Sequence, residues 1–206
     1  MSFDVVFFDF DGTLVDSAAI KRNCFFALFP DASEYGSIVS AVLLEDPDAS
    51  RYDVIPRLIE AMLAKHLVLP AGTTASAGIA SYAEHVLAGV MKCNEMPGAG
   101  RLLSALSTRC AVCIVSNTPE IDLRKLVEAR KWDGFVRAID GYPRRKTDIV
   151  KERLAEFGFD APRAIVIGDG KTDEEAAEAN GCAFHKIGRP GDLLRAATVL
   201  GIDDVY

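Results

Sequence analysis

The stretch VVFFDFDGTLVDS, residues 5–17, joins a short apolar run to two closely spaced aspartates. Four consecutive apolar residues, Val5 to Phe8, predict a strand that is covered on both faces, as in a parallel sheet. Asp9 and Asp11 follow this strand directly, and open parallel sheets form their sites at the carboxyl ends of strands. Gly12 permits a sharp turn and the close approach of an anion. The stretch therefore predicts an α/β fold and the position of its site.

The rest of the chain contains four more apolar runs of strand length, at residues 111–115, 135–139, 164–167 and 182–187. Helical patterns separate these runs, at residues 120–130, 147–157 and 172–180, and Gly158 and Gly181 are typical C-terminal stops. Such alternation of strand and helix predicts a Rossmann-like parallel sheet with right-handed crossovers.

Residues 17–92 interrupt this alternation, because their pattern favours helices at 17–29, 34–44, 50–67 and 74–92 and no strand. Turn residues separate the four patterns. We therefore expect an α/β core domain of residues 1–16 and 93–206 and an inserted all-helical cap domain of residues 17–92.

Composition excludes several classes of protein. The chain has 206 residues, a net charge of −7 and no basic block, so binding to nucleic acid is not indicated. The apolar run at residues 5–8 is too short for a signal peptide, and no stretch has the length of a membrane span. Five cysteines with irregular spacing argue against a disulfide framework. We expect a cytoplasmic protein with no membrane partner.

Further polar residues stand at the ends of other strands. Asp169 follows the run at 164–168, and Ser116 and Asn117 follow the run at 111–115. Carboxylates from two strand ends of one sheet suit Mg²⁺, which takes one or two of them and completes its shell with waters and phosphate oxygens. A metal would also offset the repulsion between a carboxylate nucleophile and an incoming phosphate. Asp9 is then the candidate nucleophile, and Asp11 the candidate general acid and base.

A transferred phosphoryl group needs further donors. Ser116 and Asn117 offer a hydroxyl and an amide, and Lys146 precedes a helix whose N-terminus favours an anion. Gly170-Lys-Thr172 is similar to the end of a nucleotide-binding P-loop, but Ile165 occupies the position that needs glycine. The three histidines have no partners at metal-ligand spacing.

In this order, the motifs resemble those of the haloacid dehalogenase superfamily. Residues 9–16, DFDGTLVD, resemble its first motif, D-x-D-G-T/V, and residues 115–118, VSNT, its second. Lys146 is the best match to the third motif, and residues 168–173, GDGKTD, resemble the fourth. Residues 96–100, MPGAG, resemble the segment that leads to the second strand through a helix. The resemblance covers the whole chain, with residues 17–92 in the place of a type 1 cap.

The resemblance implies a role for each matched residue. Asp9 is implied as nucleophile and metal ligand, and Asp11 as general acid and base that lends its backbone carbonyl to the metal. Asp169 is implied as a metal ligand that Asp173 supports. Ser116 is implied to bind phosphate, and Lys146 to act as a catalytic residue that stabilises the nucleophile and the phosphate. Gly12 and Asn117 are candidates for further phosphate contacts from their positions in the sequence. The implied activity is that of a Mg²⁺-dependent phosphatase, similar to phosphoglycolate phosphatases, acting on a small phosphorylated metabolite. Dehalogenases of this type lack the carboxylate found here at position 11.

Several alternatives stay open at this point. The third motif of the superfamily often reads Lys-Pro, whereas residues 141–147 read GYPRRKT, so Arg144 or Arg145 is an alternative to Lys146. A phosphoglucomutase would keep the same aspartates, and a phosphonatase would need a cap lysine such as Lys21. A non-catalytic phosphate-binding protein is the alternative outside enzymology. Cap residues should select the substrate, with Arg51 among the candidates.

Overall fold

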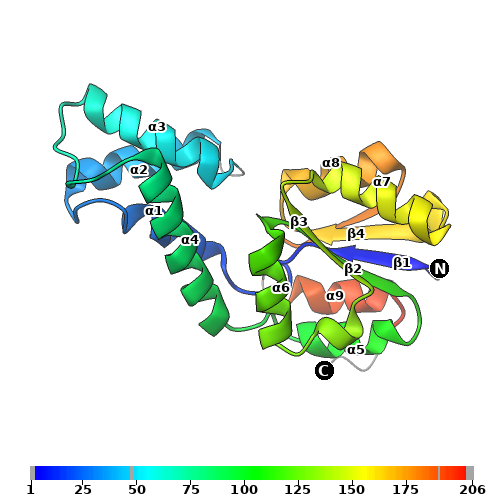
Figure 1. Cartoon of the computed structure of the whole chain (residues 1–206). Coiled ribbons are helices and arrows are strands. Elements are labelled where there is room, and N and C mark those ends of the chain that lie inside the picture. The colour runs from blue at the N-terminus through cyan, green and yellow to red at the C-terminus, as the bar shows by residue number, and fades with distance from the viewer. Residues whose placement is uncertain (1–2, 47–48, 190, 203–206) are drawn as a thin grey trace. The chain divides into compact units, whose positions relative to one another are not determined.

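The computed structural model describes residues 3–46, 49–189 and 191–202. The chain divides into two compact units, of which one comprises Met1–Asp16 and Cys93–Tyr206 and the other Ser17–Lys92. Figure 1 labels the elements of both units. The first unit is an α/β domain and the second is helical, so the expected fold class is confirmed.

The described residues of the α/β unit form a five-stranded parallel sheet in the order β3-β2-β1-β4-β5. The strands are β1 (Val5–Phe8), β2 (Ala111–Pro119), β3 (Ala138–Tyr142), β4 (Ala164–Gly168) and β5 (Ala183–Lys186). The central strand β1 is fully buried, and its Phe8 is in register with Ile114 of β2 and Ile167 of β4. Burial on both faces accounts for the continuous apolar run of this strand.

Helices cover both faces of this sheet. Figure 1 shows α7 and α8 on one face and α5 and α9 on the other. Val5 and Phe7 of β1 pack into the same core as α7 and α8, so the alternate residues Val6 and Phe8 point to the other layer. The helices of this unit are α5 (Ala99–Ser107), α6 (Glu120–Ala129), α7 (Lys146–Phe157), α8 (Lys171–Asn180) and α9 (Asp192–Val199), with 3₁₀ turns at Asp133–Phe135 and Ala161–Arg163.

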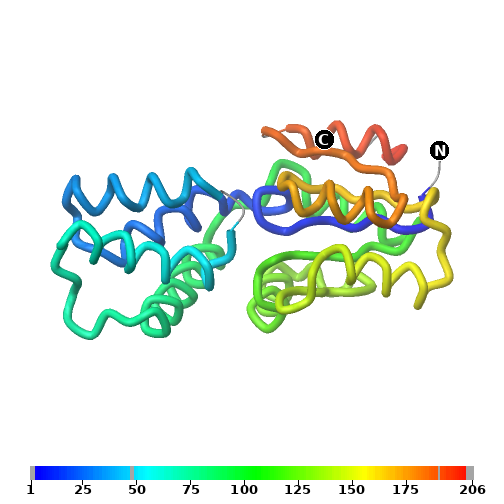
Figure 2. The backbone as a smooth tube through the Cα atoms, turned by 90° about the horizontal axis from the view of Figure 1, so that it is seen from above, coloured from blue at the N-terminus to red at the C-terminus, as the bar shows by residue number. Residues whose placement is uncertain are grey.

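The second unit consists, in its described residues, of four helices without a strand (Figure 2). They are α1 (Ala18–Phe26), α2 (Ser33–Glu45), α3 (Arg51–Ala64) and α4 (Ala75–Lys92). The unit has its own buried contacts, such as that between Phe25 of α1 and Tyr82 of α4, whose ring centroids are 4.2 Å apart. An apolar core inside residues 17–92 explains why this segment forms a unit of its own.

Two helices of this unit are shorter than the sequence predicts. α3 ends at Ala64 instead of residue 67, because Lys65 caps it and His66 adopts a left-handed φ of 58°. α1 ends at Phe26 instead of residue 29, where the i→i+3 hydrogen bonds of a tight turn replace the α-helical ones. Both ends are local turns that apolar periodicity does not register.

The two chain segments that flank the helical unit lie side by side within the α/β unit. Val15 forms an antiparallel bridge with Glu95. The N–H of Asp16 donates to the carbonyl of Asn94 at 3.0 Å, and the N–H of Met96 donates to the carbonyl of Leu14 at 2.9 Å. Both connections to the helical unit therefore begin from one short, hydrogen-bonded ribbon.

All five cysteines are among the described residues and are free thiols, as their number and spacing predict. Within the described ranges, no helix is both long and apolar enough to cross a membrane.

The third strand lies further along the chain than the apolar pattern predicts. We expected it at residues 135–139, but β3 spans Ala138–Tyr142, and a 3₁₀ turn occupies Asp133–Phe135. The expectation was wrong because the apolar run stops at Ile139, whereas the strand continues through Asp140 and Gly141. Asp140 is fully buried inside it.

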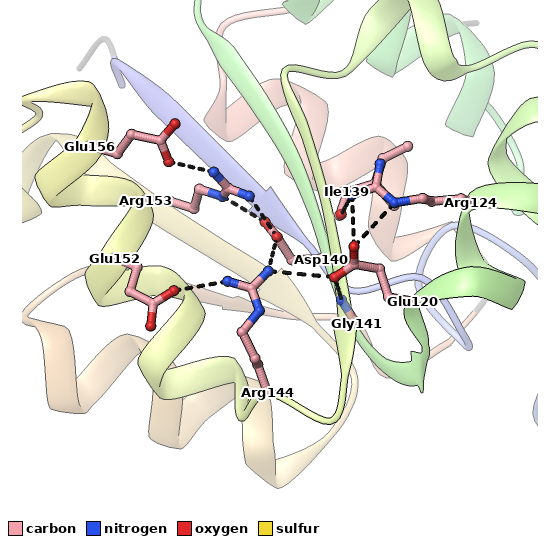
Figure 3. A network of polar contacts seen from close by, with 9 residues as sticks. All are labelled: Glu120, Arg124, Ile139, Asp140, Gly141, Arg144, Glu152, Arg153 and Glu156. Carbon is pink, nitrogen blue, oxygen red and sulfur yellow. Dashed lines mark hydrogen bonds and ion pairs between the residues drawn. The ribbon is translucent and has the colours of Figure 1, made fainter.

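Arginine side chains make the burial of Asp140 possible (Figure 3). Arg153 of α7 donates two hydrogen bonds to its carboxylate, at 2.8 and 2.7 Å, and Arg144 donates another. Burial alone would raise the pKa of Asp140, but the hydrogen bonds and charges of Arg153 and Arg144 outweigh it and hold the pKa below its usual value. Arg144 also pairs with Glu152 of α7 and Glu120 of α6. The network thus ties β3, α6 and α7 together around the β3–α7 connection.

Replacing Asp140 with Asn should destabilise the protein by about 3 kcal/mol. Loss of one partner of a buried ion pair typically costs about 3–5 kcal/mol, and Arg144 and Arg153 are partly exposed, so the lower end applies. Because the folded-state pKa of Asp140 is lowered, this stability is present above pH 3.8 and is lost as the pH falls through the folded-state pKa. Urea denaturation at pH 7 and pH 3 measures both effects.

Asp4→Asn is the matched control, since it removes the ion pair with Arg163 on the surface of the same unit. It should leave the urea midpoint nearly unchanged. Equal effects of Asp140→Asn and Asp4→Asn would contradict a special role for the buried carboxylate.

Candidate active site

Three carboxylates meet at the carboxyl end of the sheet. Asp9 follows β1, Asp169 follows β4, and Asp173 lies in the first turn of α8. One carboxylate oxygen from each lies within 4.8 Å of the other two. The adjacent, in-register strands β1 and β4 bring Asp9 and Asp169 to the same level, as strand-end reasoning predicts. Asp9 and Asp173 are buried, and Asp169 is exposed.

Two glycines make room for these carboxylates. Gly12 has a φ of +77°, and a Cβ atom at this position would lie 2.3 Å from Oδ2 of Asp169. A Cβ atom on Gly168 would lie 2.2 Å from Cγ of Asp173. Both distances are far below van der Waals contact, so the arrangement of Asp169 and Asp173 requires glycine at both positions.

Lys146, the first residue of α7, is the positive charge of this group. Its Nζ donates to Oδ1 of Asp9 at 2.6 Å and to Oδ1 of Asp173 at 2.7 Å, and its side chain is buried. Burial would lower the pKa of Lys146, but the charges of Asp9 and Asp173 outweigh it and raise the pKa above its usual value. Lys146 is therefore a fixed ammonium ion.

The neighbouring arginines point elsewhere. Arg144 pairs with Asp140 and Glu152 (Figure 3). Arg145 bonds Asp148 at 2.8 Å, and 80% of its side chain is exposed. Of the three consecutive basic residues 144–146, Lys146 is the one that contacts the carboxylates of Asp9 and Asp173.

Together, the carboxylates of Asp9, Asp169 and Asp173 carry more negative charge than Lys146 compensates. Although Asp169 as a whole residue is exposed, partial burial of its carboxyl group raises its pKa to about 7, and the charges of Asp9 and Asp173 add to this effect. Burial also raises the pKa of Asp173 to about 7, with a further contribution from Asp9, although Lys146 opposes it. Three carboxylates around one ammonium ion thus repel one another at neutral pH.

This donor set fits a hard divalent cation. Carboxylate oxygens are the ligands that Mg²⁺ prefers, and a cation among them would relieve the repulsion that raises the two pKa values. Asp9, Asp169 and Asp173 are the residues that would hold it. The group within 4.8 Å does not include a carboxylate oxygen of Asp11.

Asp11 lies instead with hydroxyl groups from the end of β2. Its Oδ2 accepts a hydrogen bond from Thr118 Oγ1 at 2.7 Å, and Ser116 Oγ lies 3.5 Å away. Asn117 is exposed, and its amide donates to Thr172 Oγ1 at 3.3 Å. The structure therefore brings Ser116 to Asp11, while Asn117 points toward the start of α8.

Thr118 is the residue that sequence reasoning did not assign. The sequence did contain a signal for Thr118, because alternate residues of a strand share a face and Ser116 lies two positions earlier.

The arrangement as a whole suits phosphoryl transfer. Asp9, a candidate nucleophile, lies beside the ammonium ion of Lys146, Asp11 lies beside hydroxyl donors, and three carboxylates could bind a cation.

Comparison with known proteins identifies the family. The family model described as haloacid dehalogenase-like hydrolase matches residues 3–181, which is most of the chain. No curated protein matches the chain significantly.

Solved structures share the fold. A predicted phosphoglycolate phosphatase from Haemophilus somnus 129PT matches with a TM-score of 0.73 and 20% identity, over 91% of this chain and 86% of that one. The HAD-hydrolase YfnB from Bacillus subtilis, bound to magnesium, matches with a TM-score of 0.73 and 18% identity, over 98% and 100%. CbbY from Rhodobacter sphaeroides, in complex with xylulose-1,5-bisphosphate, matches with a TM-score of 0.61 and 19% identity, over 88% and 84%.

Without a divalent cation, the protein should lose stability as the pH rises from 5.5 to 8. The folded-state pKa of Asp169 and of Asp173 is about 7, above the usual 3.8, so the folded state holds protons that the unfolded state has released. The resulting penalty is absent below the unfolded pKa and complete above the folded one. Mg²⁺ should therefore stabilise the protein more at pH 8 than at pH 5.5. Melting temperatures in EDTA and in Mg²⁺ test this expectation, and Asp169→Asn should weaken both trends.

Replacing Gly168 with Ala should displace Asp173 and destabilise the protein by about 1–3 kcal/mol, as over-packing does elsewhere. Gly134→Ala is the matched control, because a Cβ atom there meets nothing within 4 Å. It should change the stability by no more than about 0.5 kcal/mol. Urea denaturation of both variants decides, and similar results for the two would refute the tight packing of Asp173 against Gly168.

Proposed function

Since the chain belongs to the haloacid dehalogenase-like hydrolases, we propose that it is a Mg²⁺-dependent phosphatase that hydrolyses small phosphate monoesters through an aspartyl-phosphate on Asp9. The observation that carries the proposal is the buried Asp9 carboxylate, which contacts Lys146 and lies within 4.8 Å of Asp169 and Asp173. A lysine at this position offsets the charge of the carboxylates and attracts a phosphate.

In the first step, an oxygen of Asp9 attacks phosphorus and forms an acyl phosphate as the bond from phosphorus to the ester oxygen breaks. Asp11 donates a proton to the departing oxygen, so that an alcohol leaves. Lys146 and the hydroxyl of Ser116 donate hydrogen bonds to the phosphoryl oxygens and stabilise the charge that develops there. Backbone N–H groups around Gly12 add to this set.

In the second step, a water molecule attacks the same phosphorus atom. Asp11, now ionised, accepts a proton from this water, and the bond from Asp9 to phosphorus breaks. The products are inorganic phosphate and the regenerated carboxylate of Asp9. One aspartate thus serves as acid and then as base, which requires no other proton carrier.

Mg²⁺ bound by Asp9, Asp169 and Asp173 would supply charge neutralisation between the nucleophile and the phosphate. The backbone carbonyl of Asp11 is a further proposed ligand. The chemistry of the three carboxylates supports this assignment, because their mutual repulsion leaves a net negative charge for a cation to balance.

The substrate class that we propose is a small phosphorylated metabolite resembling phosphoglycolate or a sugar phosphate. Two structural relatives support it, a predicted phosphoglycolate phosphatase and a protein in complex with xylulose-1,5-bisphosphate. We further propose that the helical unit, Ser17–Lys92, acts as a cap that selects the substrate.

The test is phosphate release from a panel of small phosphate esters, with wild type and Asp9→Asn, each in Mg²⁺ and in EDTA. Wild type should turn over at least one ester only with Mg²⁺, and Asp9→Asn should lose at least about 10³-fold in rate because the nucleophile is gone. Mass spectrometry after rapid acid quenching should find one phosphoryl group on the peptide that contains Asp9.

Asp4→Asn is the control, since Asp4 precedes the same strand that Asp9 follows and pairs with Arg163 at the opposite end. It should keep the wild-type rate. Release that persists in Asp9→Asn would refute the assigned nucleophile. No release from any ester by wild type would refute the phosphatase proposal and favour a mutase or a non-catalytic protein.

A further inference from the structure

The end of β2 presents two hydroxyl groups to the same side. Ser116 and Thr118 are buried, with exposed fractions of 1% and 4%, whereas Asn117 between them is exposed. The register of β2 with β3 shifts between Val115 and Pro119, so the last residues of β2 depart from regular pairing. This irregular segment carries the hydroxyl groups to the carboxylate of Asp11.

Thr118 forms hydrogen bonds with both Asp11 and Ser116. Its hydroxyl donates to Oδ2 of Asp11 at 2.7 Å, the usual length of an O–H···O hydrogen bond, and its backbone N–H donates to Oγ of Ser116 at 3.1 Å. The direct contact between Ser116 and Asp11 is longer, at 3.5 Å. Thr118 thus provides the short hydrogen bond, while its backbone orients the serine.

We propose that Thr118 is a positioning residue, one that holds the Asp11 carboxyl group in the orientation for proton transfer. The inference rests on the proposed function, in which Asp11 is the general acid and base. The hydroxyl of Thr118 donates its hydrogen to Oδ2 of Asp11, so this oxygen acts as an acceptor. The proton that Asp11 transfers is therefore assigned to Oδ1.

Proton transfer then has a defined course. The Oδ1–H bond of Asp11 breaks and its proton joins the ester oxygen as the bond from that oxygen to phosphorus breaks. Oδ1 later accepts a proton from the attacking water. Throughout, the hydroxyl of Thr118 keeps its hydrogen bond to Oδ2.

Threonine suits this role better than a flexible donor. Its branched Cβ restricts χ1, and burial limits the side chain further. The donor is therefore pre-organised to hold the carboxyl group of Asp11 in one orientation.

The test compares Thr118→Val, which removes the hydroxyl at nearly constant shape, with Thr118→Ser, which keeps it. The readout is kcat/KM for an alkyl phosphate and for p-nitrophenyl phosphate in Mg²⁺. This parameter reports phosphoryl transfer to Asp9 and not the later hydrolysis. The alkyl leaving group needs a proton from Asp11, and p-nitrophenolate does not.

We expect Thr118→Val to lower kcat/KM roughly 10- to 100-fold for the alkyl ester, a part of the effect of general acid catalysis, and only a few-fold for the aryl ester. Thr118→Ser should restore most of the alkyl activity. An equal loss on both esters would show a general structural defect and overturn the proposal, as would failure of Thr118→Ser to restore activity.

A double-mutant cycle with Asp11→Asn gives an independent result. If Thr118 acts through Asp11, Thr118→Val should have no further effect on alkyl ester turnover in the Asp11→Asn background, and additive losses would overturn the proposal. Thr118→Ala replaces Thr118→Val if melting shows that the valine variant is unfolded. Thr108→Val, whose hydroxyl bonds the carbonyl of Ala105 at the end of α5, is the control and should match wild type. No turnover of either ester by wild type would overturn the proposed function, and this inference with it.

Discussion

The ammonium group of Lys146 holds together carboxylates that come from separate parts of the fold. Asp9 follows the central strand, and Asp173 lies on a helix more than 160 residues further along the chain. Buried carboxylates repel one another unless a positive charge lies between them. The first residue of α7 supplies that charge, and the arrangement of β3, the β3–α7 connection and α7 serves to place it. The ion pairs of Asp140 with Arg144 and Arg153 hold β3, the β3–α7 connection and α7 together next to Lys146.

Much of this arrangement follows from local patterns in the sequence. Four consecutive apolar residues predict β1 as a strand that is covered on both faces, and the strand-end rule then predicts that Asp9 and Asp169 converge, as they do at the ends of β1 and β4. Residues 17–92 read as helical because their apolar residues recur at helical spacing, and the structure confirms four helices there in its described residues. Such features depend on neighbours in the chain, which is why they can be predicted.

Other features depend on partners that are distant in sequence. A charged residue such as Asp140 is not expected inside a buried strand, and its burial depends on Arg153, which lies 13 residues later in the chain. The choice of Lys146 over Arg144 depends on the same network, because Arg144 is bound by Asp140. Thr118 meets Asp11 across 107 residues, and no periodicity connects the two. The sequence pattern also did not predict helix α9, Asp192–Val199.

The short ribbon formed by Leu14–Asp16 and Asn94–Met96 has a consequence for modularity. The helical unit begins and ends at positions of the α/β unit that are one hydrogen bond apart. An insertion of this geometry leaves the sheet, the carboxylates and Lys146 undisturbed by its own length or sequence. Evolution can therefore exchange or resize the inserted segment as a cassette while the chemistry of the core stays constant, because chain ends that lie close together accept a domain without strain.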